Sequence, residues 1–386
     1  MKLLYITESV PNRDPALGDG SSLIPYEVVL NLPPDVEITL LTFAGPVAVP
    51  PEVRRRCAAV HVVRTRGRLL ARLISLPGTA DTGTLERATV RALLLARRLS
   101  AASDATLVHG PHALFASTWL SGPQVLQTVD PWSIRLEMES SLGTGWRRDY
   151  RRWKSRRLLA AERSLPRHAR LLTVGARDAA EWSRLLDRPV RSIANGAEAP
   201  AQAGPGTPGP VVCFVGSLNY GPNVDSAKVL INEVAPVVWR EVPEARFVIA
   251  GRRPTPEVHG LSGPKVQVLA NVPQIGDVFA SARVAAFADT YGVGIRNSVR
   301  EALAAGLPVV ATSVAAREQD AHPLLAVEDD RAEFARKIAT LLAAPEPTAA
   351  GRDSGRAPRT WAQAAAEYLD EIKAAAVVTP AGSNGQ

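Results

Sequence analysis

Cysteine and long apolar runs are scarce in this sequence of 386 residues, and each absence excludes a class of protein. Only Cys57 and Cys213 occur, so neither a disulfide framework nor a cysteine-based zinc site is indicated. Cys213 lies inside the apolar run "VVCFVG" and is expected to be a small buried thiol. No window reaches the roughly 18 consecutive apolar residues that a membrane-spanning helix needs. The start, "MKLLYITESV", lacks the apolar core and cleavage site of an export signal, so we expect a soluble, cytoplasmic protein.

The composition is that of a globular protein with a basic balance. Hydrophobic residues make up 46% and charged residues 22%, which excludes wholesale disorder, and the length suits two α/β domains. The net charge of +7 favours anionic partners, namely sugar nucleotides, anionic lipid headgroups or nucleic acid, without choosing among them. The high content of alanine and arginine is typical of a GC-rich bacterial genome.

Apolar strands alternate with helical segments along the whole chain, which predicts parallel sheets covered on both faces. The segment 198–210, "EAPAQAGPGTPGP", is too rich in Pro, Gly and Ala for regular structure and is interpreted as a linker. It separates an N-terminal domain, 1–197, from a C-terminal domain, 211–360. A last helix at 361–375, for which packing back on the N-terminal domain is left open, precedes a disordered tail at 376–386.

A glycine-rich loop stands directly before a helix in the stretch Phe287–Ala315, "FADTYGVGIRNSVREALAAGLPVVATSVA". Gly292 and Gly294 lack Cβ atoms where the backbone must approach an oxygen-rich ligand. The helix would open toward phosphates with the amides around Ile295, Arg296 and Asn297. Glu301, one turn inside the helix, is placed to accept hydrogen bonds from the two hydroxyls of a ribose. The stretch therefore predicts a cradle for a nucleotide diphosphate.

This order of loop, helix and buried strand resembles the donor-site signature of the group 1 (GT4-type) glycosyltransferases of the GT-B fold. The segment "VGSLNYGPN" resembles the start of the donor domain in one subgroup, with Gly216, Tyr220, Pro222 and Asn223 at the matching positions, and "SIANGAE", with Asn195, resembles the element before the linker. The resemblance implies two doubly wound Rossmann-like α/β domains facing across a cleft. It also implies metal-independent transfer of a sugar from an NDP-sugar, with UDP or GDP as the nucleotide, to a small-molecule or glycan acceptor with retention of configuration. No cofactor and no nucleic acid partner are implied.

The residues that match the family, together with their chemistry, give the candidate site. The catalytic candidates are His109, Asp130 and Arg252. The donor-binding candidates are Gly216, Tyr220, Asn223, Arg253, Gly292, Val293, Gly294, Ile295, Arg296, Asn297 and Glu301. The acceptor-binding candidates are Gly18, Asp19, Gly20, Ser21 and His112, and no metal ligands are expected.

Several of these assignments have a structural alternative. His109 is either near the reacting sugar, with His112 as its rival, or a histidine that hydrogen-bonds backbone at a strand end. Asp130, which with "SIR" resembles an acidic turn of the acceptor domain, is either an acceptor contact or base, or a turn former. Arg252 and Arg253 follow the strand "FVIAG" and suit bidentate phosphate contact, with only one expected to point inward.

The chain also departs from the family pattern. Val293 stands where most members have a first glutamate that touches the donor sugar, and Ser217 and Leu218 stand where arginine and lysine are common. Ser298 replaces a frequent lysine or proline, and the N-terminal "GDGSS" replaces two adjacent glycines and an arginine. A sugar-nucleotide-binding subunit without turnover is therefore an alternative. A dinucleotide oxidoreductase is disfavoured because neither candidate turn supplies G-x-G-x-x-G.

The segment "WRRDYRRWKSRR", Trp146–Arg157, carries seven basic residues within a predicted helical region from about Ser140 to Leu165. The spacing of Trp146, Tyr150 and Trp153 puts the aromatic side chains on one helical face. The simplest interpretation is that this helix packs its aromatics against the protein and solvates its charges. Peripheral contact with the inner membrane surface or with an anionic acceptor is the alternative, whereas nucleic-acid binding is disfavoured because no nucleic-acid module accompanies it.

Overall fold

The computed structural model describes the chain except residues 15–19, 44–47, 66–81, 129–130, 142–143, 197–208, 273, 293–295, 318, 320, 345–358 and 379–386. The chain forms two compact units. Unit 1 comprises Met1–Arg13, Leu17–Ala194 and Trp361–Gln386, and unit 2 comprises Asp14–Ala16 and Asn195–Thr360. Most of the predicted linker, 198–210, lies outside the described residues.

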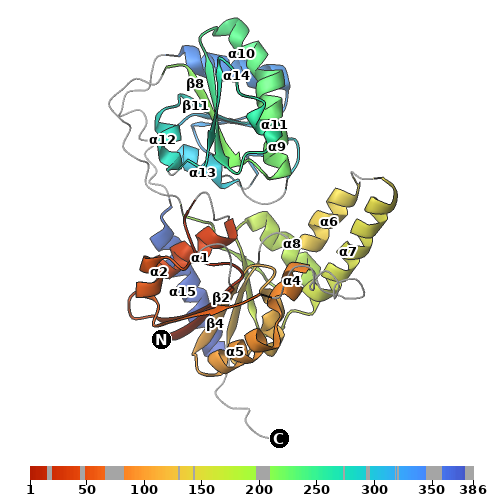
Figure 1. Cartoon of the computed structure of the whole chain (residues 1–386), viewed down its shortest axis with the longest axis vertical. Helices are drawn as coiled ribbons and strands as arrows, with labels where there is room; N and C mark the ends of the chain where they lie inside the picture. Colours follow the sequence, from red (N-terminus) through yellow and green to blue (C-terminus); the bar gives the residue numbers. More distant parts are fainter. Residues whose placement is uncertain are drawn as a thin grey trace, which may run out of the picture. The chain divides into compact units, whose positions relative to one another are not determined.

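Unit 1 is built on a seven-stranded parallel sheet of order β3-β2-β1-β4-β5-β6-β7 (Figure 1). Its strands are β1 (Lys2–Thr7), β2 (Glu37–Phe43), β3 (Ala59–Val63), β4 (Ala105–His109), β5 (Gln124–Gln127), β6 (Arg170–Thr173) and β7 (Arg191–Ser192). Its helices are α1 (Gly20–Asn31), α2 (Pro51–Arg56), α4 (Thr82–Arg87), α5 (Val90–Ala101), the 3₁₀ helix η1 (Leu114–Trp119), α6 (Trp132–Ser141), α7 (Gly145–Arg163), α8 (Ala176–Leu186) and α15 (Trp361–Val378).

Alternate residues of β1 supply the two faces of this sheet. Leu3 and Tyr5 pack in a core cluster with side chains of α1, α2 and α15, while Leu4 and Ile6 pack in another with α5 and α8. The C-terminal helix α15 is thus part of unit 1, and it extends three residues beyond the predicted end at 375. Glu371 of this helix binds Arg170 of β6 at 2.7 Å and Arg191 of β7 at 2.5 Å.

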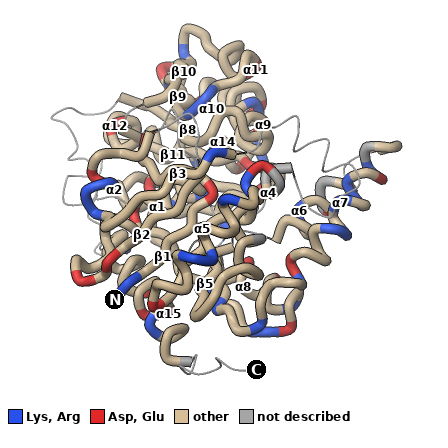
Figure 2. The backbone as a smooth tube through the Cα atoms, turned by 60° about the horizontal axis from the view of Figure 1, so that its bottom comes forward, with Lys and Arg blue, Asp and Glu red and all other residues tan. Residues whose placement is uncertain are grey.

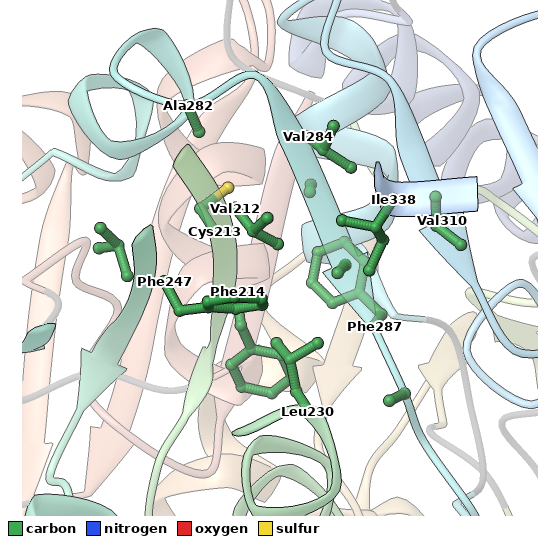
Figure 3. Close-up of a cluster of buried hydrophobic side chains, with 14 of the residues drawn as sticks. Val212, Cys213, Phe214, Leu230, Phe247, Ala282, Val284, Phe287, Val310 and Ile338 are labelled. Carbon is green, nitrogen blue, oxygen red and sulfur yellow. The ribbon is translucent and has the colours of Figure 1, made fainter. Parts of the chain in front are cut away.

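Unit 2 is built on a six-stranded parallel sheet of order β10-β9-β8-β11-β12-β13. Its strands are β8 (Val211–Ser217), β9 (Arg246–Arg252), β10 (Val266–Ala270), β11 (Val284–Phe287), β12 (Val309–Ala311) and β13 (Leu325–Val327). Its helices are α9 (Gly221–Val229), the π-helical turn η2 (Leu230–Val234), α10 (Ala235–Glu241), α11 (Pro256–His259), α12 (Ile275–Ala280), α13 (Asn297–Ala304) and α14 (Arg331–Ala343). In its core the rings of Phe214 and Phe287 lie 5.8 Å apart, with Leu230 and Ile338 nearby (Figure 3).

The prediction of two doubly wound α/β domains is confirmed, and most strands fall where the apolar runs placed them. The charged helical region predicted from about Ser140 to Leu165 is present as α7, but it starts later than predicted: α6 ends at Ser141 and α7 begins at Gly145, whose φ of 63° belongs to left-handed backbone. The segment "SIR", Ser133–Arg135, which was expected in an acidic turn, lies within the first helical turn of α6. Ser133 there donates a 2.5 Å hydrogen bond to Glu162 of α7, which joins the two helices.

Candidate active site

The sheet of unit 2 reverses its strand order between β8 and β11, and ligands of doubly wound folds bind outside the carboxyl ends of the strands at such a point. The segments that leave this edge begin at Leu218, Arg253 and Ala288, directly after β8, β9 and β11. Gly251 permits the close approach of β8 and β9, because a Cβ there would overlap the carbonyl oxygen of Gly216. The predicted donor residues that the structure describes all lie in, or directly after, the elements around this switch point.

Arg296 occupies the switch point of unit 2. Its guanidinium forms an ion pair with Asp289, with side-chain exposures of 11% and 8%, and Nη2 donates to the carbonyl oxygen of Val215 at 3.4 Å. The guanidinium carbon lies 4.9 Å and 4.7 Å from the ring centroids of Phe214 and Phe287. Burial lowers the pKa of Arg296 and the Asp289 carboxylate opposes that shift, so the guanidinium stays protonated.

Asn223 ties this guanidinium to the segment after β8. Its Oδ1 accepts a 3.0 Å hydrogen bond from Nη1 of Arg296, and its Nδ2 donates a 3.0 Å bond to the carbonyl oxygen of Ser217. Gly216 leaves room beside them, because a Cβ there would come within 2.8 Å of Nδ2 of Asn223 and displace that side chain. Tyr220 stands at the N-cap of α9. Of the predicted "G-x-x-x-Y-x-P-N" residues, Asn223 therefore bonds Arg296 directly and Gly216 lies beside this pair, a connection that the sequence did not indicate.

The start of the glycine-rich loop is held from two sides. The hydroxyl of Tyr291 donates a 2.8 Å hydrogen bond to Asp225 of α9. On the other side, Thr312 donates to the carbonyl oxygen of Asp289 at 2.8 Å, and Arg317 donates to that of Gly292 at 3.1 Å. Gly292 has a φ of 154°, which L-residues rarely adopt. Side chains of α9 and of the segment after β12 thus hold the described residues at the start of the loop.

Helix α13 begins at Asn297 and has no side-chain cap: Arg296 at the N-cap makes no capping bond, and no acidic residue lies in the first turn. By contrast, Asp330 caps α14 by accepting from the amides of Ala332 and Glu333. The first amides of a helix need acceptors, and an anion can supply them. Glu301 lies on the same helix, one turn after Asn297, and is partly exposed.

The "ANG" element before the linker contacts the start of this helix. Nδ2 of Asn195 donates to Oδ1 of Asn297 at 3.3 Å, and Arg300 donates to the carbonyl oxygen of Asn195 at 3.2 Å. This bond uses Oδ1 of Asn297 as an acceptor. Its side-chain nitrogen, Nδ2, is the group that can donate to a ligand.

Arg252 and Arg253 differ in their backbone as well as in exposure. Arg252 ends β9 and is partly exposed, whereas Arg253 is exposed and has a left-handed φ of 48°. The amide of Arg253 donates to Oδ1 of Asn271, another residue with positive φ, at 3.1 Å. Both residues lie at the carboxyl edge of the sheet, where a phosphate would bind. The phosphate-binding role stays a prediction for each.

The sheet of unit 1 reverses its order between β1 and β4, and a buried carboxylate lies there. Glu8, 7% exposed, follows β1 directly, and its Oε2 accepts a 2.9 Å hydrogen bond from the amide of His112. Gly110 has a φ of 92°, and a Cβ there would overlap the Glu8 side chain. Arg87 donates to the carbonyl oxygen of Glu8 at 2.7 Å.

The two candidate histidines have different surroundings. His109 is 0% exposed at the end of β4, with Nδ1 2.6 Å from Oε1 of Gln127. His112 is partly exposed, and its ring meets that of Trp132 edge to face at 4.5 Å. The structural alternative for His109 expected a hydrogen bond to the backbone, whereas the structure pairs its ring with the side chain of Gln127. The catalytic role of His109 stays a prediction. Only His112 of the pair presents surface to a ligand in this structure.

The remaining predicted residues are placed as follows. Gly20 and Ser21 open α1, and the carbonyl oxygen of Ser21 accepts from Ser9 at 3.5 Å. The other residues lie outside those that the structure describes: Gly18, Asp19, Asp130, Val293, Gly294 and Ile295.

Residues 209–344 match the family model described as glycosyl transferases group 1. The matched segment lies within unit 2. The whole chain is similar to HepE of Anabaena, solved with UDP and glucose, at 15% identity and a TM-score of 0.61, covering 96% of this chain and 95% of that one. A UDP-forming α,α-trehalose-phosphate synthase from Burkholderia xenovorans matches at 12% identity and a TM-score of 0.63, covering 97% and 99%. A search of curated protein sequences finds no match.

Sucrose-phosphate synthase from Thermosynechococcus elongatus is a further structural neighbour, at 14% identity and a TM-score of 0.61, covering 97% of this chain and 96% of that one. At such identities the likeness establishes the fold alone. Together with the two parallel sheets, it confirms the predicted GT-B fold. The segment that matches the family model falls in the unit that contains the glycine-rich loop, Arg296 and α13.

Three residues of the two switch points were not predicted. Glu8 directly follows β1 and Asp289 comes two residues after β11, and an acidic residue just past the carboxyl end of a strand is the signal that identifies them. Arg317, beside Gly292, has no comparable signal, because it approaches the loop only through the fold. Among the described residues, no group of three His, Cys, Asp or Glu side chains is arranged to hold a metal ion.

Proposed function

We propose that the chain is a glycosyltransferase that moves a hexosyl or related sugar from an NDP-sugar bound in unit 2 to an acceptor bound by unit 1, with retention of configuration and without a metal ion. The observation that carries this proposal is the uncapped N-terminus of α13 at the switch point, within the segment that matches the group 1 family. The alanine- and arginine-rich composition supports a place in bacterial glycan or specialised-metabolite biosynthesis.

The diphosphate would lie at the first turn of α13, where backbone amides and the amide nitrogen of Asn297 donate to its oxygens. When the bond from the sugar to the diphosphate breaks, negative charge grows on the departing phosphate. The amides and a guanidinium, Arg252 or Arg253, would stabilise that charge in place of a metal. Arg296 would not bind the phosphate, because its Nη1 already donates hydrogen bonds to Asp289 and Asn223. Its role would be to hold the end of the loop in place.

Glu301 would bind the ribose of the donor, as the resemblance to the family implies. Nucleotide-sugar donors bound to structural neighbours, such as the UDP-glucose of HepE, support UDP as the first nucleotide to test. In unit 1, His112 and the carboxylate of Glu8 lie at the edge where the acceptor would bind, with Glu8 fixing the backbone of His112.

The test is release of nucleoside diphosphate from UDP-glucose and other sugar nucleotides, in the presence of a chelator and a panel of acceptors. We expect release that persists with the chelator and that falls roughly 10- to 100-fold in Glu301→Ala, the loss expected for a charged hydrogen-bonding group. Glu333→Ala on α14, a partly exposed helix glutamate like Glu301, is the matched control and should keep full activity.

A second candidate, a sugar-nucleotide-binding subunit without turnover, is favoured by Val293 at the position of the family's first glutamate. Nucleotide binding with no release from any donor, in every acceptor mixture, would support this candidate and refute the enzyme. Loss of activity on adding the chelator would contradict the metal-independent mechanism.

A further inference from the structure

The aromatic residues of α7 are exposed, so the interpretation that this helix packs them against the protein is wrong. Trp146 is 73% exposed, Tyr150 55% and Trp153 42%, and together these three form what we call the aromatic stripe. Their spacing of four and three residues places them along one face of α7. The opposite face packs on α6, where Ser155 is buried and donates to the carbonyl oxygen of Ser133 at 2.8 Å.

The basic charge of the chain is concentrated on this helix. Its 19 residues include eight Lys or Arg and two Asp or Glu, a net charge of +6, whereas the whole chain carries +7. The exposed Arg152 and Arg156 flank the aromatic stripe on one side and the partly exposed Lys154 lies on the other. In both views the hairpin of α6 and α7 projects from the rest of unit 1 (Figures 1 and 2).

We propose that the aromatic stripe of α7 docks on the surface of an anionic lipid bilayer. Tryptophan and tyrosine favour the headgroup region of a membrane, and flanking basic residues attract anionic headgroups. A helix of 19 residues, roughly 28 Å long, would lie in the plane of the surface with its aromatic face inserted and its long basic side chains reaching the headgroups.

The geometry favours a bilayer over single-stranded nucleic acid. Bases bind aromatic residues by stacking on open ring faces. Here the rings of Tyr150 and Trp153 stack on each other, with centroids 5.9 Å apart and planes 26° apart, and the guanidinium of Arg157 covers Trp153 at 4.4 Å. Insertion among lipid headgroups uses the edges and the bulk of these rings, which remain exposed. This inference does not depend on the proposed transfer activity.

The test is co-sedimentation of the full chain with vesicles of equal parts phosphatidylglycerol and phosphatidylcholine, compared with vesicles of phosphatidylcholine alone. We expect at least about tenfold stronger binding to the anionic vesicles, weakened by salt. The variant Trp146→Ala/Tyr150→Ala/Trp153→Ala should lose at least about tenfold in binding to the anionic vesicles, and Arg152→Gln/Arg156→Gln should lose most of the preference for them.

Matched controls come from α5, where Val90 and Leu94 are 70% and 61% exposed and Arg97 and Arg98 are exposed as well. Val90→Ala/Leu94→Ala and Arg97→Gln/Arg98→Gln should bind vesicles like the unaltered chain. Equal loss in these controls, or no binding of the unaltered chain to anionic vesicles, would overturn the proposal. Binding to polyuridylate that is lost in the α7 variants, without vesicle binding, would assign the surface to nucleic acid instead. Thermal unfolding of each variant verifies that the fold is kept.

Discussion

In unit 2 the switch point between β8 and β11 is filled by the side chain of Arg296, whereas in unit 1 the corresponding place between β1 and β4 is filled by the carboxylate of Glu8. Arg296 finds a charged partner, Asp289, and two aromatic rings, so side chains hold the loop. Glu8 finds a backbone amide, that of His112, and needs a glycine at 110 to make room. One edge depends on a buried charge pair and the other on backbone geometry, so the two should fail under different substitutions.

The largest expected effect is on the charge pair of unit 2. Arg296→Ala leaves Asp289 buried without its cation and should lower the free energy of unfolding by about 3–5 kcal/mol. Arg336→Ala is the control, because Arg336 and Glu333 pair at 2.8 Å with side chains 53% and 46% exposed and should contribute at most about 1 kcal/mol. Urea unfolding of both variants measures the difference, and equal losses would mean that the buried pair does not hold the loop.

The edge of unit 1 should respond to a single methyl group. Gly110→Ala imposes a side chain on a φ of 92° and a clash with Glu8, so we expect a loss of roughly 2–4 kcal/mol. Gly122→Ala is matched in backbone, since Gly122 has a φ of 75°, but a Cβ there meets nothing within 4 Å, and its cost should be only about 1–2 kcal/mol. If the two substitutions cost the same, the packing of Glu8 against Gly110 contributes nothing measurable.

A smaller and pH-dependent effect is expected where α15 joins unit 1. Burial raises the pKa of Glu371, but hydrogen bonds and charge from Arg170 and Arg191 outweigh it, so the pKa lies below its usual value. A lowered carboxyl pKa contributes stability above the unfolded value, near 4.3, and that contribution disappears as the pH falls through the folded pKa. Glu371→Gln should therefore cost about 1 kcal/mol at neutral pH, since both guanidiniums are partly exposed.

The gap in the free energy of unfolding between this variant and the unaltered chain should narrow as the pH falls below about 4.3 and close once the pH has passed the lowered folded pKa, where Glu371 is protonated in both states. Urea unfolding at neutral pH and near pH 3 measures both gaps. A gap of constant size would show that Glu371 does not act through its charge. The contribution of Glu371 to the stability of unit 1 would then not depend on pH.

Local signals in the sequence predicted much of the fold. The helix "ARDAAEWSRLL" and the strand "VQVLA" are present with the predicted bounds, because each has a clear apolar pattern between breaking residues. The break between α6 and α7 was not predicted, although Gly143 and Gly145 mark it, because residues that favour helix stand on both sides. The exposure of the aromatic stripe was not predicted either, because spacing identifies a face but not its neighbours.

The candidate site shows the same limit. The glycine-rich loop and Asn223 could be recognised as separate motifs, but their connection through Arg296 joins residues 73 positions apart. Glu8 and His112 are 104 positions apart, and only the parallel pairing of β1 with β4 brings them together. A sequence gives the types of residue at a strand end, while the partners of those residues depend on the order of strands in the sheet.

If unit 2 binds a nucleotide through α13, titration calorimetry with UDP, GDP and dTDP should detect that binding. We expect one nucleotide to bind the unaltered chain, with an affinity weakened roughly 10- to 100-fold in Glu301→Ala and unchanged in the control Glu333→Ala. Binding of none of the three, or the same affinity in Glu301→Ala, would contradict the assignment of the donor site.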